Sequence, residues 1–296
     1  MIMLMEQILL CVILAVFGLV MGSFAGATAW RIRARQLVQD KADGEKVDNK
    51  EYAQLLPLTK TTTKMDRSRC LHCGHILAWY DLLPLVGWAS TKGTCRYCHE
   101  KIGWLEPLIE LGMASLFVTS YLFWPEALTG PLQIVHFVLW LIAGVLLAIL
   151  FVYDLKWYLL PNVVVFPLIG VGIVVAAVNI LTLGNLGMSL ANLIIAVFIL
   201  SGLYFILWLI SKGQWIGFGD VKLGLGLALL LGDWQLAFIA LFSANVIGCL
   251  FVIPGMLTGK VTRRTRVPFG PLLILGTIIA MLAGPFIQAW YFTSFI

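Results

Sequence analysis

Residues 132–153 read LQIVHFVLWLIAGVLLAILFVY, a run without Asp, Glu, Lys or Arg. A helix of about 20 apolar residues crosses the ~30 Å hydrocarbon layer of a bilayer, so this run predicts a membrane-spanning helix. The whole chain has the same character, because 60% of its 296 residues are hydrophobic and only 12% are charged. This composition excludes disordered, collagen-like and disulfide-rich secreted proteins. The sequence therefore predicts an integral membrane protein.

Outward from this run, seven further apolar stretches fit the same length rule. They predict an all-α polytopic membrane protein with about eight transmembrane helices. The sixth stretch has only about a dozen residues, so it has to tilt or lie partly inside the helix bundle. The predicted spans are 7–30, 104–124, 132–153, 160–182, 188–211, 221–232, 234–258 and 268–293.

The basic residues set the predicted orientation. With both termini outside, all 20 Lys and Arg lie in segments on the cytoplasmic side or at the inner end of the sixth span, as the positive-inside rule requires. The net charge of +5 follows from this sorting, and we expect no nucleic-acid partner. Residues 31–103 are the one sizeable soluble part and face the cytoplasm. Within them, about 36–68 lacks apolar periodicity, which predicts a solvated, mobile insertion.

Four of the six cysteines form two pairs, Cys70-Leu-His-Cys73 and Cys95-Arg-Tyr-Cys98. Two such knuckles supply the four thiolates of a closed, tetrahedral, structural Zn²⁺ site. We therefore expect a small zinc-ribbon-like domain between the first and second spans. Reduced thiols without metal, or a redox-active pair, form the alternative interpretation. The neighbouring histidines are interpreted as surface or supporting residues rather than ligands: His72, His75 and His99.

Carboxylates within or at the ends of spans are costly there, and each is a candidate functional residue. They are Glu106, Glu110, Asp154 and Asp220. Asp154 ends the third span, Asp220 opens the sixth in Gly217-Phe-Gly-Asp220-Val-Lys222, and the predicted topology places both near the cytoplasmic face. Two neighbouring carboxyls share one proton, which is aspartic-protease chemistry. Glycines at 217 and 219 let an extended substrate strand approach the acid closely.

Other interpretations of these acids stay open. Asp154 and Asp220 are also compatible with ordinary residues at helix ends, and Glu106 and Glu110 with a polar contact that holds helices together. A proton- or cation-coupled transporter would use the two aspartates as an ion relay. A presenilin-like intramembrane protease would share the aspartates but not the four-cysteine region.

The chain resembles the bacterial prepilin peptidases, or type 4 leader peptidases, over nearly its whole length apart from residues 36–68. The resemblance extends from the membrane helices to the cysteine domain. The motifs that carry it are Gly22-Ser23-Phe24 with Arg31, the four cysteines, Trp79-Tyr80-Asp81 with Pro84, Gly93-Thr-Cys95-Arg96, Pro107 with Glu110, Asp154 with Pro161, Gly217-Phe-Gly-Asp220-Val-Lys222-Leu and Val267-Pro-Phe-Gly-Pro271.

This resemblance implies a catalytic pair, site-supporting residues and metal ligands. The pair is Asp154 and Asp220; the supporting residues are Gly217, Gly219, Lys222 and Glu110; the ligands are Cys70, Cys73, Cys95 and Cys98. It also implies cleavage of a short basic leader from type IV prepilins and type II secretion pseudopilins, at the cytoplasmic face of the bacterial inner membrane. Methylation of the new N-terminus with S-adenosylmethionine rests on the resemblance alone.

Three domains follow from these interpretations: a first transmembrane helix with the Gly-Ser-Phe motif (1–30), a cytoplasmic four-cysteine domain of methyltransferase type (31–103) and a membrane-embedded aspartic peptidase domain (104–296). Two departures from the family pattern stand out. Ala25-Gly26 follows the Gly-Ser-Phe motif in place of the usual Leu-Asn, and Asn162 replaces a common Asp. A peptidase without methylation, whose zinc loop docks assembly proteins, is therefore a further alternative.

Overall fold

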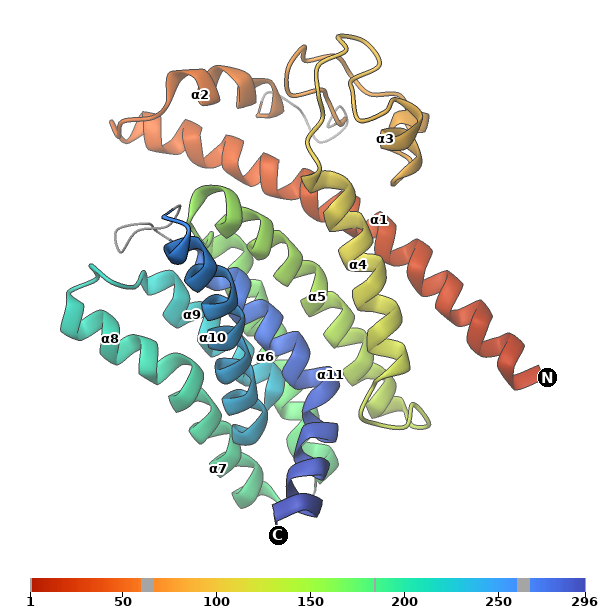
Figure 1. Cartoon of the computed structure of the whole chain (residues 1–296), viewed down its shortest axis with the longest axis vertical. Coiled ribbons are helices and arrows are strands. Elements are labelled where there is room, and N and C mark those ends of the chain that lie inside the picture. The colour runs from red at the N-terminus through yellow and green to blue at the C-terminus, as the bar shows by residue number, and fades with distance from the viewer. Residues whose placement is uncertain (1, 60–66, 184, 260–266, 296) are drawn as a thin grey trace. The chain divides into compact units, whose positions relative to one another are not determined.

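The computed structural model describes residues 2–59, 67–183, 185–259 and 267–295. Regular structure in these ranges is helical, and two isolated β-bridges, Arg69–Ile76 and Thr94–Lys101, are the only strand-like pairings there. The elements, labelled in Figure 1 where space allows, are α1 (Ile2–Ala42), α2 (Asn49–Leu55), η1 (Leu56–Leu58), η2 (Trp79–Leu82), α3 (Val86–Ser90), α4 (Leu105–Leu122), α5 (Pro131–Trp157), α6 (Asn162–Leu183), α7 (Leu186–Val197), the π-helical η3 (Phe198–Gly202), α8 (Leu203–Ser211), α9 (Phe218–Leu231), α10 (Trp234–Leu257) and α11 (Phe269–Phe295).

Seven helices in the described residues are long and apolar enough to cross a membrane. They match seven of the predicted spans, with the predicted span 188–211 formed by α7, η3 and α8 in succession. The predicted sixth span is α9. Its 14 residues make a helix of only ~21 Å. That is less than the ~30 Å hydrocarbon thickness, as the sequence already indicated.

The chain separates into two compact units, a first unit (Met1–Val118) and a second unit (Thr119–Ile296). In the first unit, α1 and α4 pack closely at Gly18 and Gly22. A Cβ added at Gly22 would lie 2.6 Å from the Cα of Glu110, and one at Gly18 would lie 2.7 Å from the Cα of Ala114. Two glycines four residues apart give neighbouring membrane helices this close approach. Gly22 of the Gly-Ser-Phe motif therefore has a packing role.

Residues 36–59 of the predicted insertion 36–68 contain regular helices, which the missing apolar periodicity did not predict. Helix α1 continues to Ala42, and α2 folds back along it (Figure 1). Leu37 and Leu55 are 2% and 1% exposed in a small hydrophobic cluster, and Arg33 donates two hydrogen bonds to Glu51 at 3.1 and 2.8 Å. A few apolar residues at the end of α1 and on the short helix α2 suffice for this cluster, and so few residues produce no periodic signal in the sequence. Residues 60–66 lie outside the described residues.

In the second unit, α9 is the central helix. It contacts α6, α7, η3, α8, α10 and α11, and its residues Leu223, Leu227 and Ala228 are fully buried. A helix that is apolar on all sides belongs inside a bundle. The first turn of α9 carries Asp220, so the bundle positions this aspartate directly.

Candidate active site and metal centre

Asp154 lies in the last turn of α5 and is 5% exposed. The helix ends at Tyr158, which has a left-handed backbone with φ of 56°, and α6 begins at Asn162, directly after Pro161. One backbone group contacts the Asp154 carboxyl: the N–H of Gly270 donates a hydrogen bond to Oδ2 at 3.0 Å. Gly270 is the second residue of α11, so the N-terminus of that helix faces the acid.

The Gly270 backbone also lies very close to the Asp154 side chain. A Cβ at this position would lie 2.7 Å from Oδ2 and 3.3 Å from Cγ of Asp154. No side chain fits into that space without displacing the carboxyl. The glycine in Val267-Pro-Phe-Gly-Pro271 therefore has a direct physical role at the site.

Asp220 is the third residue of α9 and is partly buried. Its backbone N–H donates a hydrogen bond to the carbonyl of Gly217, the residue that caps the helix, at 3.1 Å, and its carboxyl lies near the Gly217 backbone. A carboxyl at this position closes the first helical turn and fixes its own rotamer. The orientation of Asp220 is thus set locally, whereas that of Asp154 depends on a distant helix.

Asp154 and the start of the helix that carries Asp220 have a common neighbour, Leu160. Asp220 lies within electrostatic range of the Asp154 carboxyl and of the buried phenol of Tyr204 from α8. Leu160 lies against both arms of the site: a Cβ at Gly219 would be 3.1 Å from Leu160 Cβ, and one at Gly270 would be 3.5 Å from Leu160 Cδ2. Helices α5 and α11 thus bring the Asp154 carboxyl and the Gly270 N–H into contact, and the start of α9, which carries Asp220, lies against the same Leu160 side chain.

The four residues predicted to support the site, Gly217, Gly219, Lys222 and Glu110, lie in different parts of the structure. Gly219 makes room for Leu160 of the chain itself, whereas Gly217 is exposed and leaves the approach to Asp220 open. Lys222 Nζ donates a hydrogen bond to Asn162 Oδ1 at 2.5 Å and links α9 to the start of α6. Glu110 belongs to the first unit, where it is 8% exposed and its Oε2 accepts a hydrogen bond from the Leu85 N–H at 2.8 Å.

The four paired cysteines converge in the first unit. Their Sγ atoms all lie within 4.8 Å of one another, and Cys70 and Cys98 Sγ are 3.9 Å apart. Tetrahedral Zn²⁺ with Zn–S bonds of about 2.3 Å requires sulfurs ~3.8 Å apart, so the donor set fits such an ion. The group comprises these four residues and none of the neighbouring histidines; the His75 ring instead packs at a tilt against Tyr97, with ring centroids 3.7 Å apart.

Each cysteine pair sits on a short turn of the same design. The Cys70 N–H donates to the His75 carbonyl at 3.0 Å, and the Cys95 N–H donates to the Glu100 carbonyl at 2.8 Å. Burial raises the pKa of the Cys95 thiol, but N–H groups of Cys98 and Tyr97 outweigh it and lower the pKa to about 7. Burial raises the pKa of Cys70. Neighbouring thiols cannot all ionise unless a cation compensates their charge.

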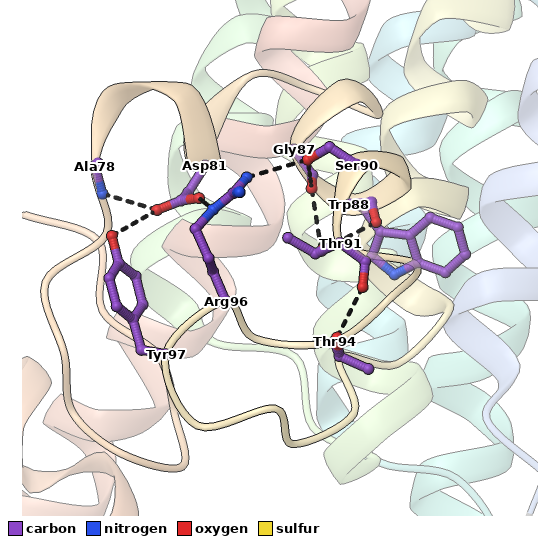
Figure 2. Close-up of polar contacts among 9 residues, drawn as sticks. All are labelled: Ala78, Asp81, Gly87, Trp88, Ser90, Thr91, Thr94, Arg96 and Tyr97. Atoms are coloured by element: carbon purple, nitrogen blue, oxygen red, sulfur yellow. Dashed lines mark hydrogen bonds and ion pairs between the residues drawn. The ribbon is translucent and has the colours of Figure 1, made fainter.

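A polar network joins the second cysteine turn to the segment before it, as Figure 2 shows. Arg96 Nε donates to Asp81 Oδ1 at 2.9 Å, and the Tyr97 hydroxyl donates to Oδ2 at 3.0 Å. The Ala78 N–H completes the set at 3.2 Å. Burial raises the pKa of Asp81, but these three hydrogen bonds and the Arg96 charge outweigh it and leave the pKa below its ordinary value. Asp81 is therefore ionised and connects the second cysteine turn to the segment before it.

Sequence reasoning missed the role of Gly270, the proximity of Tyr204, the Asp81–Arg96 tie and the Gly18-Gly22 packing. Gly18 and Gly22 have the GxxxG spacing, which predicts close helix packing. For Gly270 and Tyr204, no spacing in the sequence relates them to Asp154 or Asp220. Their roles emerge only from helix packing.

Comparisons with known proteins cover both units. A family model described as "Bacterial Peptidase A24 N-terminal domain" matches residues 16–124, and one described as "Type IV leader peptidase family" matches residues 140–253. No solved structure matches the chain.

Three curated relatives align with this chain over at least 90% of their own length. A protein of Escherichia coli O78:H11 named "Type 4 prepilin-like proteins leader peptide-processing enzyme" is 30% identical over 90% of this chain and 91% of its own length. Two proteins named "Prepilin leader peptidase/N-methyltransferase" are each 29% identical. The one from Aeromonas hydrophila covers 95% of this chain and 93% of itself, and the one from Dichelobacter nodosus covers 90% of both.

Proposed function

The chain belongs to the type IV leader peptidase family, and we propose from this premise that it cleaves the leader peptide of prepilins and N-methylates the new N-terminus. The names of the relatives carry both activities, and the aspartate pair supplies the chemistry for the first. Those names are of leader-processing enzymes, so the transporter hypothesis gains no support. The apolar helices, together with membership of this family, support a multi-pass protein of the inner membrane.

The peptidase mechanism follows from two carboxyls that share one proton. The ionised member takes a proton from a water molecule, whose oxygen attacks the scissile carbonyl carbon. The protonated member donates a hydrogen bond to the carbonyl oxygen and stabilises the charge that develops there. Collapse of the tetrahedral intermediate breaks the C–N bond, and the departing amine receives a proton from a carboxyl. The Gly270 N–H keeps Asp154 in place through these steps.

The sidedness of the protein is part of this proposal. All 20 Lys and Arg are consistent with a cytoplasmic cysteine domain and external termini. A basic leader would stay on the cytoplasmic side by the same rule, next to an aspartate pair at the inner ends of α5 and α9. Prepilins and pseudopilins with a basic leader and an apolar first helix are therefore the proposed substrates.

We assign Zn²⁺ to the four-cysteine cluster and S-adenosylmethionine to the methylation step. The sulfur spacing supports Zn²⁺, which when bound would hold the two cysteine turns together and leave no open position for a water. Support for the methyl donor comes from the relatives' names. Labelled S-adenosylmethionine, incubated with processed pilin and enzyme, tests this step. Absence of label on the pilin despite active cleavage would contradict methylation.

The cleavage assay tests the central proposal. Asp154→Asn and Asp220→Asn are each co-expressed with a prepilin, and processing is followed on a gel. Asp233→Asn is the matched control, because Asp233 is the N-cap of α10 and Asn caps a helix equally well. We expect either site variant to lose cleavage by several orders of magnitude while the control keeps it. Processing by either site variant would reject the assigned pair.

A further inference from the structure

The segment from Leu77 to Ser90 is unlike the rest of the soluble part of the chain. Asp81 is its only charged residue, and Arg96 and Tyr97 hold that carboxyl (Figure 2). Four apolar side chains nevertheless point to solvent and are between 41 and 73% exposed. We call them the apolar turn: Trp79, Leu82, Leu83 and Val86. A gathering of exposed apolar side chains on a polar domain indicates a binding surface.

The apolar turn is attached to a membrane helix within the first unit. The N–H of Leu85 donates to Glu110 Oε2 at 2.8 Å, and Glu110 lies five residues after the start of α4 at Leu105. Helix α4 has 18 residues and is therefore only ~27 Å long. It falls short of the ~30 Å hydrocarbon layer, so its first residues lie close to the edge of that layer. Leu85, which contacts Glu110, must lie at the same depth.

The backbone of residues 84–87, which form the tip of the apolar turn, suits a medium that contains little water. Pro84 has no N–H, the Leu85 N–H contacts Glu110, the Val86 N–H donates to the Pro84 carbonyl at 2.6 Å and the Gly87 N–H donates to the Leu83 carbonyl at 2.8 Å. All N–H groups of residues 84–87 are thus paired, as backbone at membrane depth requires. Leu85 also has φ of 59°, a strained conformation for a residue with a side chain, and the surrounding contacts hold it there.

Besides Trp79, a second exposed tryptophan lies beside the start of α4. Trp104, directly before α4, is 68% exposed, and its ring lies 4.4 Å from that of Trp88, whose Nε1 donates to the Gly103 carbonyl at 3.3 Å. Tryptophan is enriched at the boundary between headgroups and hydrocarbon, where its ring is apolar and its N–H remains polar. Trp79 and Trp104 therefore fit the interfacial layer of a bilayer.

We propose that the apolar turn is seated in the lipid interface and anchors the cysteine domain to the membrane surface, with Glu110 as the polar residue that holds its strained tip. The occupant of this surface is the lipid bilayer. The observations that support this are the hydrogen bond to α4, the short length of α4 and the absence of free charge. The proposal does not depend on the peptidase or methyltransferase activity.

Photocrosslinking in lipid nanodiscs tests the proposal on the full chain. Benzoylphenylalanine replaces Leu83 or Val86, the protein is reconstituted in phosphatidylethanolamine and phosphatidylglycerol, and adducts are identified by mass spectrometry. The control position is Glu45, an exposed residue beyond the end of α1. We expect phospholipid adducts at 83 and 86 and none at 45. Adducts to residues 119–296, or no adduct at either position, would overturn the proposal.

Fluorescence of wild-type protein and of Trp79→Phe gives a second measurement that does not depend on the crosslinker. The emission that disappears in Trp79→Phe is attributed to Trp79. We expect lipids brominated near the headgroup end of the acyl chain to quench that component, and aqueous iodide to leave it largely unchanged. Quenching by iodide but not by brominated lipid would place Trp79 in water and contradict the proposal.

Discussion

The four-cysteine cluster and the aspartate pair are assembled in different ways. Cys70 and Cys98 are 28 positions apart, and each cysteine pair lies on its own short turn. Asp154 and the Gly270 N–H that contacts it are 116 positions apart, and Asp220 comes from a third helix. The cluster is therefore built from two local turns, whereas the aspartates depend on the packing of helices from across the second unit. The two sites should fail independently of each other.

The largest expected effect is on the aspartate pair. In the proposed mechanism the two carboxyls act as one group, so the double variant Asp154→Asn/Asp220→Asn should lose no more cleavage than either single variant, all by several orders of magnitude. The metal content should stay unchanged, since the cysteines lie in the other unit. Kinetics of cleavage and metal analysis on the same samples check both statements. Losses that multiply in the double variant would contradict a shared role.

A smaller effect is expected at Gly270. Gly270→Ala places a methyl group where the Asp154 carboxyl now lies and should displace that carboxyl. A shift of about 1 Å at a catalytic group costs on the order of 100-fold in rate, so we expect kcat to fall by about that factor with KM little changed. The control is Gly170→Ala in α6, where an added Cβ meets nothing within 4 Å. Equal rates for the two variants would show that Gly270 does not position Asp154.

Loss of a cysteine ligand should act on the other region. Cys70→Ser should reduce bound zinc from about one ion per chain to near zero and destabilise the first unit, because the proposed Zn²⁺ would hold the two turns together. Cys249→Ser, an exposed cysteine of α10, is the control and should keep the metal. Cleavage should fall less than in Gly270→Ala, since the aspartate pair is built from the second unit. Zinc near zero in the unmodified protein would contradict the assignment.

The smallest effect is expected at Asn162, one of the departures from the family pattern. Asn162→Asp would turn the hydrogen bond with Lys222 into an ion pair. Exposed ion pairs contribute about 0.2–1 kcal/mol, so cleavage should change by less than about fivefold. A larger loss would mean that Lys222 acts at the aspartate pair and needs to be free of an acidic partner. Steady-state rates at several prepilin concentrations distinguish these outcomes.

Much of the fold followed from local patterns. Seven predicted spans match helices because about 20 apolar residues suffice to identify a span. The two cysteine pairs predicted the cluster because each knuckle directs both sulfurs inward on its own. The pattern failed at residues 36–59, where Leu37 and Leu55 form a cluster too small to produce a periodic signal. The roles of Glu110, Lys222 and the glycines before Asp220 stay predictions.

By itself, the sequence determined that the chain crosses a membrane repeatedly, that four cysteines can hold one metal ion and that two aspartates belong to one family motif pattern. These properties depend on composition and on spacings of a few residues. Only the tertiary structure decided that Gly270 contacts Asp154, that Leu160 lies against both arms of the site and that Glu110 holds the strained turn at Leu85. Such contacts join residues far apart in the chain, and close packing of helices, which no local spacing encodes, selects them.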